Sequence, residues 1–259
     1  MTEINAPAKV NIFLKITGHK EGYHTLLSRF VQVTDLYDTI RFVPCECETF
    51  TIEGCPGIPR ESNTIYKAWK ALNETTGDLD LLEFFYHHKV VVEKRIPSRA
   101  GLGGGSSDAA AFMRLARQVC DLKLTTDELA RIGSRIGADI PFFIYDYPSA
   151  NVSGFGELVE PFDETPLALE IDTPSVACDT AAVYSIFKER FLDNIDPLSF
   201  LGWERIPSAE LLERITDPEK LNDLYPAALL ACPRLRDYAK PGWFFSGSGS
   251  SFFKVRNGK

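Results

Sequence analysis

The chain has 259 residues, of which 44% are hydrophobic and 25% charged, the balance of an ordinary globular protein with room for two modest domains. Its formal net charge of −8 argues against a nucleic acid or an anionic membrane as a partner bound through a general basic surface. An anionic substrate therefore needs a local basic patch, for which the candidates are Lys9, Lys15, Lys94, Arg95 and Arg99.

Cysteine usage indicates a reducing location. Six cysteines are too few for a disulfide scaffold, and the first residues have neither the charged nor the apolar region of a secretory signal, so we expect a cytoplasmic protein. Cys45, Cys47 and Cys55 cluster without a nearby histidine or a second CxxC pair, which makes a poor zinc site, and we interpret them as packing or surface thiols. No apolar run reaches the roughly 20 residues that cross a bilayer.

The first predicted element is a strand over residues 10–16, where apolar and polar residues alternate. Lys9 stands at its start and Asn11 within it. A lysine at the end of a strand is most often simply solvated, so this position taken alone indicates no function.

Residues 18–26 predict a glycine-bounded loop that presents Tyr23 beside His24. Stacking on an aromatic ring together with a hydrogen bond from an imidazole is a common way to hold a flat base. The alternative is an ordinary loop tyrosine with a solvated histidine. Residues 30–33 and 38–42 follow as further predicted strands.

Asn63 precedes a run over residues 64–72 that predicts a helix with Asn63 as its N-cap. A β-branched run over residues 89–95 then predicts a strand that leads directly into a glycine-rich stretch, residues 97–108.

The glycine-rich stretch is a candidate phosphate site. Four glycines within residues 101–105 let the backbone adopt positive φ and let a ligand approach. Ser106, Ser107 and Asp108 can cap the helix predicted over residues 109–122, whose free N–H groups and dipole favour an anion. The stretch is not a P-loop, since no GKS or GKT occurs, and Ser106 stands where a dinucleotide fingerprint has its third glycine. A plain connection is the alternative.

A second helix is predicted from a capping box formed by Thr125 and Glu128, and we expect Gly137 to end it in the left-handed conformation. Asp139 follows within the run GADIPFF. An acid just after a helix end is either the cap of the next turn or a functional carboxylate, and the residues alone leave both open.

The passage over residues 148–166 is rich in proline and glycine and predicts an exit from the first domain, with the boundary near Leu158. Residues 168–171 and 252–255 then predict strands. Thr180 stands at the start of a predicted helix.

Three stretches, in their order and spacing, resemble the three motifs of the GHMP kinases, the small-molecule kinases named for galactose, homoserine, mevalonate and phosphomevalonate. The first stretch is PAKVNIFL at residues 7–14, the second is the glycine-rich stretch with Pro97, and the third is FSGSGSS at residues 245–251. The resemblance therefore covers nearly the whole chain.

Within the family, the GYHTL run at residues 22–26 resembles the subfamily that acts on 4-diphosphocytidyl-2-C-methyl-D-erythritol, and it implies that Tyr23 and His24 hold the cytosine. The run TAAVY at residues 180–184 resembles a helix start that places a hydroxyl and a second aromatic ring against the cytidine. The run NDLYPA at residues 222–227 matches a further recurrent phrase, which we interpret as structural.

The resemblance implies a kinase that uses ATP and Mg²⁺ to phosphorylate the 2-hydroxyl of this small cytidine diphosphate substrate. It implies Asp139 as the base, Lys9 as the cation that holds this carboxylate ionised, and Ser107 as a group that reaches the metal. For Asn63 and Lys94, a cap or strand-edge role would explain the residue without a ligand. The residues implied for ATP binding are Asn63, Lys94, Pro97, Gly101, Leu102, Gly103, Gly104, Gly105, Ser106 and Ser107. The residues implied for substrate binding are Asn11, Tyr23, His24, Thr180, Tyr184, Gly247, Ser248 and Gly249.

The implied fold is α+β, the two-domain GHMP kinase fold, with an N-terminal ATP-binding domain over residues 1–158 and a ferredoxin-like C-terminal domain over residues 159–259. The second domain looks shortened at its end. We expect a monomer or a weak homodimer.

Two alternative functions stay open. One is a kinase for a homoserine- or mevalonate-type alcohol, against which the GYHTL run argues. The other is a nucleotide-binding protein without catalysis, against which Lys9 and Asp139 argue.

Overall fold

The computed structural model describes residues 2–20 and 22–256, apart from the side chain of Tyr23. It mixes helices and sheets, which confirms the α+β prediction. Packing divides the chain into two compact units. Unit 1 comprises Met1–Ala8, Thr34–Ile96 and Gly103–Asp146, and unit 2 comprises Lys9–Val33, Pro97–Leu102 and Tyr147–Lys259. The domain boundary near residue 158 stays a prediction.

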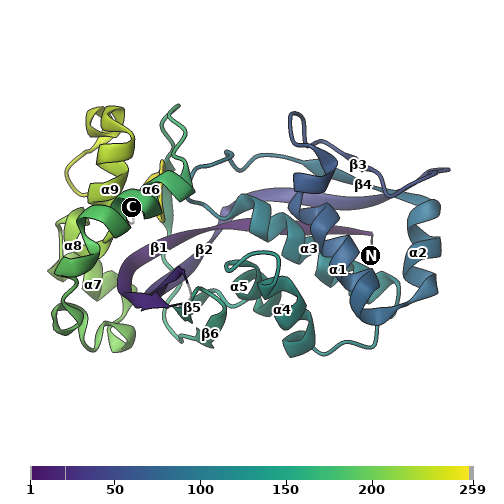
Figure 1. Cartoon of the computed structure of the whole chain (residues 1–259), viewed down its shortest axis with the longest axis horizontal. Coiled ribbons are helices and arrows are strands. Elements are labelled where there is room, and N and C mark those ends of the chain that lie inside the picture. Colours follow the sequence, from purple (N-terminus) through teal and green to yellow (C-terminus); the bar gives the residue numbers. More distant parts are fainter. Residues whose placement is uncertain (1, 21, 257–259) are drawn as a thin grey trace. The chain divides into compact units, whose positions relative to one another are not determined.

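Two long strands, β1 (Glu3–Lys20) and β2 (Tyr23–Pro44), pair with each other and contribute residues to both units (Figure 1). A short turn with Gly22 at φ 86° separates them. The loop predicted over residues 18–26 is therefore wrong, because the glycine lets the chain reverse at once and the flanking residues enter the strands. The strand predicted over residues 10–16 is part of β1, and the strands predicted over residues 30–33 and 38–42 are both parts of β2.

Unit 1 combines sheet strands with a layer of helices. Its elements, besides parts of β1 and β2, are β3 (Ile52–Glu53), β4 (His88–Glu93), η1 (Arg60–Ser62), α1 (Thr64–Thr76), α2 (Leu79–Tyr86), α3 (Gly104–Val119), α4 (Thr126–Ser134) and α5 (Ile140–Tyr145). β4 pairs antiparallel with the C-terminal half of β2 and parallel with β3. Helices α1, α3, α4 and α5 pack against one another. Phe42 anchors the core, with ring centroids of Phe85 and Phe112 at 5.0 and 5.7 Å.

The local helix signals of unit 1 are confirmed where a side chain makes the cap. Asn63 caps α1 by accepting from the N–H of Ile65, and Thr125 forms the predicted capping box with Glu128. None of the helices in the described part of the chain is long and apolar enough to span a membrane.

Two helix limits differ from the prediction. Helix α3 begins at Gly104 instead of residue 109, because Gly103 turns left-handed (φ 72°) and takes the N-cap position, so Ser106, Ser107 and Asp108 lie inside the helix. Helix α4 ends at Ser134, and Gly137 is not among the glycines with positive φ.

Unit 2 contains a second part of the large sheet and a smaller sheet. Its elements, besides parts of β1 and β2, are β5 (Ser149–Gly154), β6 (Leu158–Pro161), β7 (Leu169–Asp172), β8 (Phe244–Phe245), β9 (Phe252–Val255), α6 (Thr180–Arg190), α7 (Ser208–Arg214), α8 (Pro218–Leu221), α9 (Leu224–Ala231), η2 (Leu192–Asn194), η3 (Pro197–Phe200), η4 (Trp203–Arg205) and η5 (Pro233–Tyr238). β5 pairs with the N-terminal half of β2 and β6 pairs with β5, so the passage predicted as a domain exit forms two strands. The smaller sheet has the order β7-β9-β8, which includes both strands predicted there.

A buried arginine organises one side of unit 2. Arg29 on β2 is 0% exposed, and its guanidinium donates to Asn151 at 2.7 Å and to Ser208 at 3.3 Å. Glu164 Oε1 lies 3.6 Å from Arg29 Nη1. The N–H and the hydroxyl of Ser208 donate to the same carboxylate. Burial lowers the pKa of Arg29 to about 10, against the opposing effect of Glu164. The cluster joins β2, β5 and α7.

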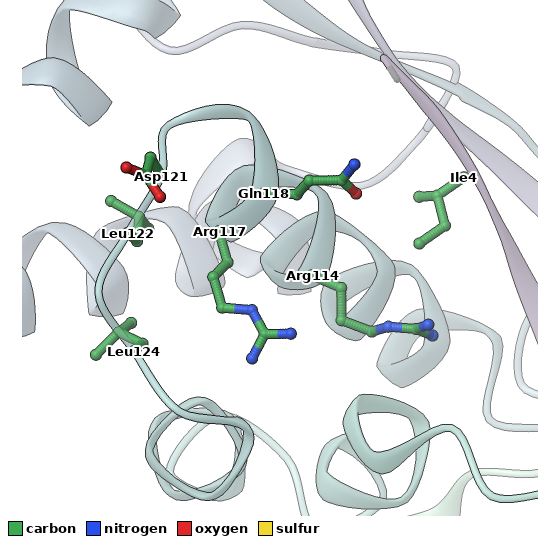
Figure 2. A pocket seen from close by; sticks show the side chains of 7 residues that line it. All are labelled: Ile4, Arg114, Arg117, Gln118, Asp121, Leu122 and Leu124. Carbon is green, nitrogen blue, oxygen red and sulfur yellow. The ribbon is translucent and has the colours of Figure 1, made fainter.

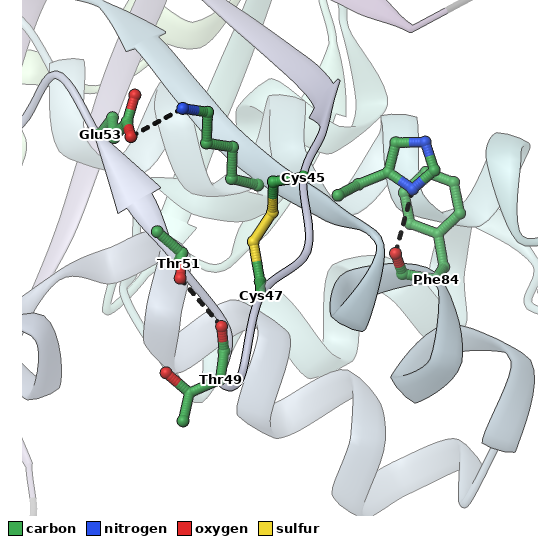
Figure 3. The surroundings of a disulfide bond; sticks show 8 residues. Cys45, Cys47, Thr49, Thr51, Glu53 and Phe84 are labelled. Atoms are coloured by element: carbon green, nitrogen blue, oxygen red, sulfur yellow. Dashed lines mark hydrogen bonds and ion pairs between the residues drawn. A yellow bond between two sulfur atoms is a disulfide. The ribbon is translucent and has the colours of Figure 1, made fainter.

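Cys45 and Cys47 are joined by a disulfide, with their Cα atoms 5.6 Å apart (Figure 3). The prediction of thiols is therefore wrong for these two residues, whereas Cys55 is free. An extended segment with one residue between two cysteines places both side chains on the same side, which the sequence prediction did not weigh. Backbone hydrogen bonds of 2.9 Å to the carbonyls of His87 and Tyr86 hold this segment.

Candidate active site

The three motif stretches meet in unit 2 around Gly101. This glycine has φ 74°, and a Cβ there would lie 2.2 Å from the carbonyl oxygen of Ser246, so no other residue fits. Ser246 Oγ donates to the carbonyl of Gly101 at 3.0 Å and accepts from the N–H of Asn11 at 3.3 Å. The N–H of Lys9 donates to the carbonyl of Leu102 at 2.9 Å. The first and third motifs therefore pack directly on the second.

Asn222 supports the turn of the third motif. Its Nδ2 donates to the carbonyls of Phe245 and Gly247 at 3.1 and 2.9 Å, so the structural interpretation of this residue is confirmed. The adjacent Asp223 pairs with Lys15 and also accepts from the N–H of Ile16. Lys15, a candidate for the basic patch, is therefore already bound to a carboxylate of the protein.

The turn of the third motif is left-handed at both of its glycines. Gly247 has φ 58° and Gly249 has φ 91°, with Ser248 between them almost buried. A Cβ on Gly247 would lie 3.3 Å from Asn11 Oδ1, so the turn approaches the first motif closely. Of the predicted ATP-binding residues in unit 2, Leu102 is buried and Pro97 is exposed.

The rest of the glycine-rich stretch lies in unit 1 and forms the first turn of α3. Gly103 is the N-cap and no side chain caps the helix, so the N–H groups of residues 104–106 have no partner within the helix. A Cβ on Gly104 would lie 3.0 Å from the side chain of Ile96, which favours glycine there. Unpaired N–H groups at the positive end of a 16-residue helix suit an anion.

Lys94 is held beside this helix start by two carboxylates. Its Nζ donates to Asp108 Oδ2 at 2.7 Å and to Asp38 Oδ2. Asp38 also accepts from the N–H groups of Arg95 and Ile96, which fixes the end of β4. Burial raises the pKa of Asp108 to about 7, with Lys94 acting in the opposite direction. The pKa of Lys94 is itself raised, because the two carboxylates outweigh the effect of its burial.

Two buried oxygens at this helix start have no hydrogen-bond partner in the described structure, Ser107 Oγ and Asp108 Oδ1. Both residues are at most 4% exposed. Such atoms are the hard oxygen donors that Mg²⁺ takes, usually one or two from the protein with the rest from phosphate and water. The donor chemistry therefore fits the predicted metal role of Ser107, and it adds Asp108 as a neighbour.

Asp139 is the N-cap residue of α5 by position, yet its side chain makes no capping hydrogen bond. The capping alternative left open by the sequence is therefore not fulfilled. Its side chain is half-buried, in unit 1, whereas Lys9 belongs to unit 2.

Lys9 lies in the interior of unit 2. It is 4% exposed, so the alternative of a solvated strand-end lysine is wrong. Its Nζ donates to Asn11 Oδ1 at 2.7 Å and lies 4.5 Å from the ring centroid of Phe30. Asn11 in turn donates to Ser28 at 2.9 Å.

The residues predicted for the cytidine lie together in unit 2. The rings of His24 and Tyr184 are 5.4 Å apart, and Thr180 Oγ1 lies 2.8 Å from Ser248 Oγ. Asp179 caps α6, which leaves the Thr180 hydroxyl for other bonds. The pKa of His24 is lowered, by burial first and then by His19 and Lys188. The side chain of Tyr23 lies outside the described structure.

Unit 1 also has a hollow of about 520 Å³ away from the glycine-rich turn (Figure 2). Arg114, Arg117 and Gln118 point into it from the C-terminal half of α3. Arg114 pairs with Asp146 at 2.7 Å and Arg117 donates to Thr126, so both guanidinium groups already bind the protein. None of the predicted site residues lines it.

The family follows from comparison with known proteins. The model of the GHMP kinases N-terminal domain matches residues 63–147. A 4-diphosphocytidyl-2-C-methyl-D-erythritol kinase of Sulfurovum sp. (strain NBC37-1) is 62% identical over 99% of this chain and 100% of its own length. A protein of the same name from Sulfurimonas denitrificans is 46% identical over 97% and 96%. This chain belongs to the 4-diphosphocytidyl-2-C-methyl-D-erythritol kinase family of GHMP kinases.

Solved structures agree with this assignment. A crystal structure of 4-(cytidine 5′-diphospho)-2C-methyl-D-erythritol kinase has a TM-score of 0.73 at 30% identity and covers 99% of this chain and 90% of its own. The mevalonate kinase of Methanococcus jannaschii has a TM-score of 0.59 at 15% identity, over 98% of this chain and 90% of its own, which shows the shared fold alone. As a member of a kinase family, this protein uses ATP as its co-substrate.

Several residues that shape the site of this kinase carried no signal in the sequence. Ser28 and Phe30 reach the first motif from the neighbouring strand, and Asp38 reaches Lys94 from 56 residues away. A single serine or aspartate in a strand has no motif of its own. Knowledge of how β1 and β2 pair would have found the first two, since residues two apart share a face.

Proposed function

We propose that this kinase transfers the γ-phosphoryl group of ATP to the 2-hydroxyl of 4-diphosphocytidyl-2-C-methyl-D-erythritol, a step in the non-mevalonate synthesis of isoprenoid precursors. The proposal is supported by whole-length identity to relatives named for this substrate. The observation that carries it is the grouping of His24, Thr180, Tyr184 and Ser248 in unit 2, from three distant parts of the sequence. Rings beside hydroxyls suit a base with an attached sugar.

In the proposed reaction, the substrate oxygen forms a bond to the γ-phosphorus and the bond from that phosphorus to the β–γ bridging oxygen breaks, so that ADP leaves. Asp139 accepts the proton of the hydroxyl. Lys9 supplies a positive charge that orients the hydroxyl. The N–H groups at the start of α3 and the turn at Gly101 hold the phosphates, which makes catalysis mainly a matter of positioning and charge.

Mg²⁺, bound with ATP, compensates the charge of the phosphoryl oxygens, and Ser107 is the residue we propose to hold it, with Asp108 beside it. Asn63 and Lys94 are proposed to lie near the adenine, in addition to the cap and the ion pairs that they form. We further propose a cytoplasmic monomer or weak homodimer without a nucleic-acid partner, and an ATP-binding domain that ends near residue 158.

The reaction is tested by ADP release in a coupled assay with ATP and Mg²⁺, in which the cytidyl substrate, homoserine and mevalonate are offered separately. We expect turnover with the cytidyl substrate alone. Turnover of homoserine or mevalonate instead would contradict the role of the GYHTL run. Bound ATP without turnover of any of the three alcohols would contradict the proposed reaction.

The proposed binding of the cytidine is tested by the variant Thr180→Val, which lacks the hydroxyl that lies within hydrogen-bond distance of Ser248 Oγ. We expect a KM for the cytidyl substrate raised about tenfold and an unchanged KM for ATP, because a lost hydrogen bond to a neutral group costs about 1 kcal/mol or somewhat more. Thr173→Val is a matched control, since Thr173 makes the same kind of contact with Ser251 at 2.8 Å. Equal effects of the two variants would argue against Thr180 as a substrate contact.

A further inference from the structure

The inference starts from the fully buried hydroxyl of Ser28 on β2. Ser28 is 0% exposed, and it lies beside Asn11 and Lys9 of β1, which are 2% and 4% exposed. Lys9 and Asn11 are two apart on one strand and therefore share a face, as do Ser28 and Phe30 on the next. A buried ammonium depends on acceptors and ring faces for its position, because water cannot supply them.

The hydrogen bonds of Ser28 have one consistent direction. Its Oγ donates the single hydroxyl proton to the carbonyl oxygen of Phe13. Toward Asn11 the hydroxyl can then only accept, so the Nδ2 end of the amide faces it at 2.9 Å. The opposite end, Oδ1, is left facing Lys9 Nζ at 2.7 Å, where an ammonium can only donate. Ser28 therefore determines which end of the Asn11 amide meets the lysine.

Asn11 is fixed at its backbone as well. Its N–H donates to Ser246 Oγ at 3.3 Å, and the turn at Gly247 lies so close to its side chain that a Cβ added to this glycine would be 3.3 Å from Oδ1. The Phe30 ring supports the ammonium from another side, with its centroid 4.5 Å from Nζ. An amide oxygen and a ring face together restrict where the positive charge of Lys9 can lie.

We propose that Ser28 is a positioning residue for phosphoryl transfer, which acts through Asn11 to hold the ammonium of Lys9 in one place against Phe30. This inference rests on the proposed role of Lys9. An ammonium held in place meets the reacting group in one orientation, whereas a mobile ammonium does so only part of the time. Loss of the Ser28 hydroxyl is therefore expected to lower kcat.

The test compares Ser28→Ala with Ser208→Ala. Ser208 is also 0% exposed and in unit 2, and its hydroxyl donates to Glu164 at 2.7 Å in the Arg29 cluster, outside the predicted site. Both variants lose a buried hydroxyl, so both are expected to lower the melting temperature. Only Ser28→Ala is expected to reduce kcat, about tenfold, with KM for ATP unchanged. Ser28→Cys replaces the hydroxyl by a slightly larger thiol, which is a weak donor and acceptor, and supplies a second variant with the same expected direction.

A double-mutant cycle with Lys9→Met separates this inference from the role of Lys9. If Ser28 acts through Lys9, Ser28→Ala lowers kcat in the wild type and has no further effect in Lys9→Met. A full additional loss in the double variant overturns the inference, as does an unchanged kcat in both Ser28 variants. A Lys9→Met enzyme with normal kcat overturns the proposed role of Lys9 itself. A Lys9→Met enzyme that is inactive, beside a Ser28→Ala enzyme with normal kcat, overturns the positioning role alone.

Discussion

The candidate site contains one chain of buried polar groups that is fully bonded and, elsewhere, buried polar atoms that have no partner in the described structure. In unit 2, the side chains of Lys9, Asn11 and Ser28 form a chain of hydrogen bonds that ends on a backbone carbonyl. Ser107 Oγ and Asp108 Oδ1 in unit 1, and His24 Nε2 in unit 2, have no partner in the described structure. A buried polar atom without a partner costs about 1–3 kcal/mol. We interpret the chain from Lys9 to Ser28 as a part built before substrate arrives, and the atoms without a partner as positions that a ligand completes.

The largest expected effect is a loss of kcat, without a loss of ATP binding, when Asp139 of unit 1 is changed. Asp139→Asn keeps the shape of the side chain and removes the base, so we expect kcat to fall by about 10²-fold or more while the dissociation constant for ATP is kept. Steady-state kinetics measure kcat, and calorimetric titration measures the dissociation constant for ATP. Asp121→Asn is the control, because the side chain of Asp121 is 84% exposed. A near-normal kcat for Asp139→Asn would show that Asp139 is not the base.

The next effect concerns the unpaired hydroxyl. Ser107→Ala is expected to raise the Mg²⁺ concentration for half-maximal activity by about tenfold, because it removes a proposed ligand of the metal. The measurement is a Mg²⁺ titration at saturating ATP. Ser134→Ala on α4, whose hydroxyl bonds its own helix at 3.0 Å, is the control. An unchanged Mg²⁺ requirement would argue against Ser107 as a ligand.

A smaller effect is expected in how the free energy of unfolding depends on pH, through His24 of unit 2. The folded state lowers the pKa of His24 below its ordinary value of 6.5, through burial and then through His19 and Lys188. The unfolded chain therefore binds a proton at His24 more readily than the folded chain does. The contribution of neutral His24 to the free energy of unfolding is fully present above pH 6.5 and is lost as pH falls through the folded pKa. The free energy of unfolding in urea is expected to fall less between pH 7.5 and 5 in His24→Gln than in the wild type. His87→Gln, at an exposed histidine, is expected to leave the wild-type fall in place, and an equal fall in all three proteins would contradict the lowered pKa.

The smallest effect is expected at the disulfide of unit 1. The bridge closes a ring around a single residue, so the chain-entropy model gives a loss of about 1–2 kcal/mol for Cys45→Ser. Mass spectrometry after alkylation without reductant shows whether the bridge is present. Cys232→Ser, at a free cysteine, is the control. Full alkylation of Cys45 and Cys47 in the untreated protein would contradict the bridge.

The sequence predicted the features that depend on neighbours along the chain. The Asn63 cap and the capping box of Thr125 and Glu128 are such cases, because donor and acceptor lie within three residues. The start of α3 was mispredicted because Gly103 turns left-handed and takes the N-cap position. At Gly104 a Cβ would lie 3.0 Å from the side chain of Ile96, a restriction that no local pattern encodes.

The parts of the site that could not be predicted depend on pairing between strands. Ser28 meets Asn11 across 17 residues and Lys94 meets Asp38 across 56, and only the register of the sheet brings them together. The motif residues themselves were found because the chain resembles a family, and their roles stay predictions.

The contrast between the bonded chain from Lys9 to Ser28 and the oxygens without a partner at the start of α3 is tested most directly by thermal unfolding with and without Mg²⁺ and a non-hydrolysable ATP analogue. Ligand that binds the folded protein raises its melting temperature. We predict that Ser28→Ala lowers the melting temperature of the free protein and keeps the rise caused by the ligand. We predict that Ser107→Ala keeps the melting temperature of the free protein and loses most of the rise. The reverse pattern, or equal behaviour of the two variants, would contradict the account.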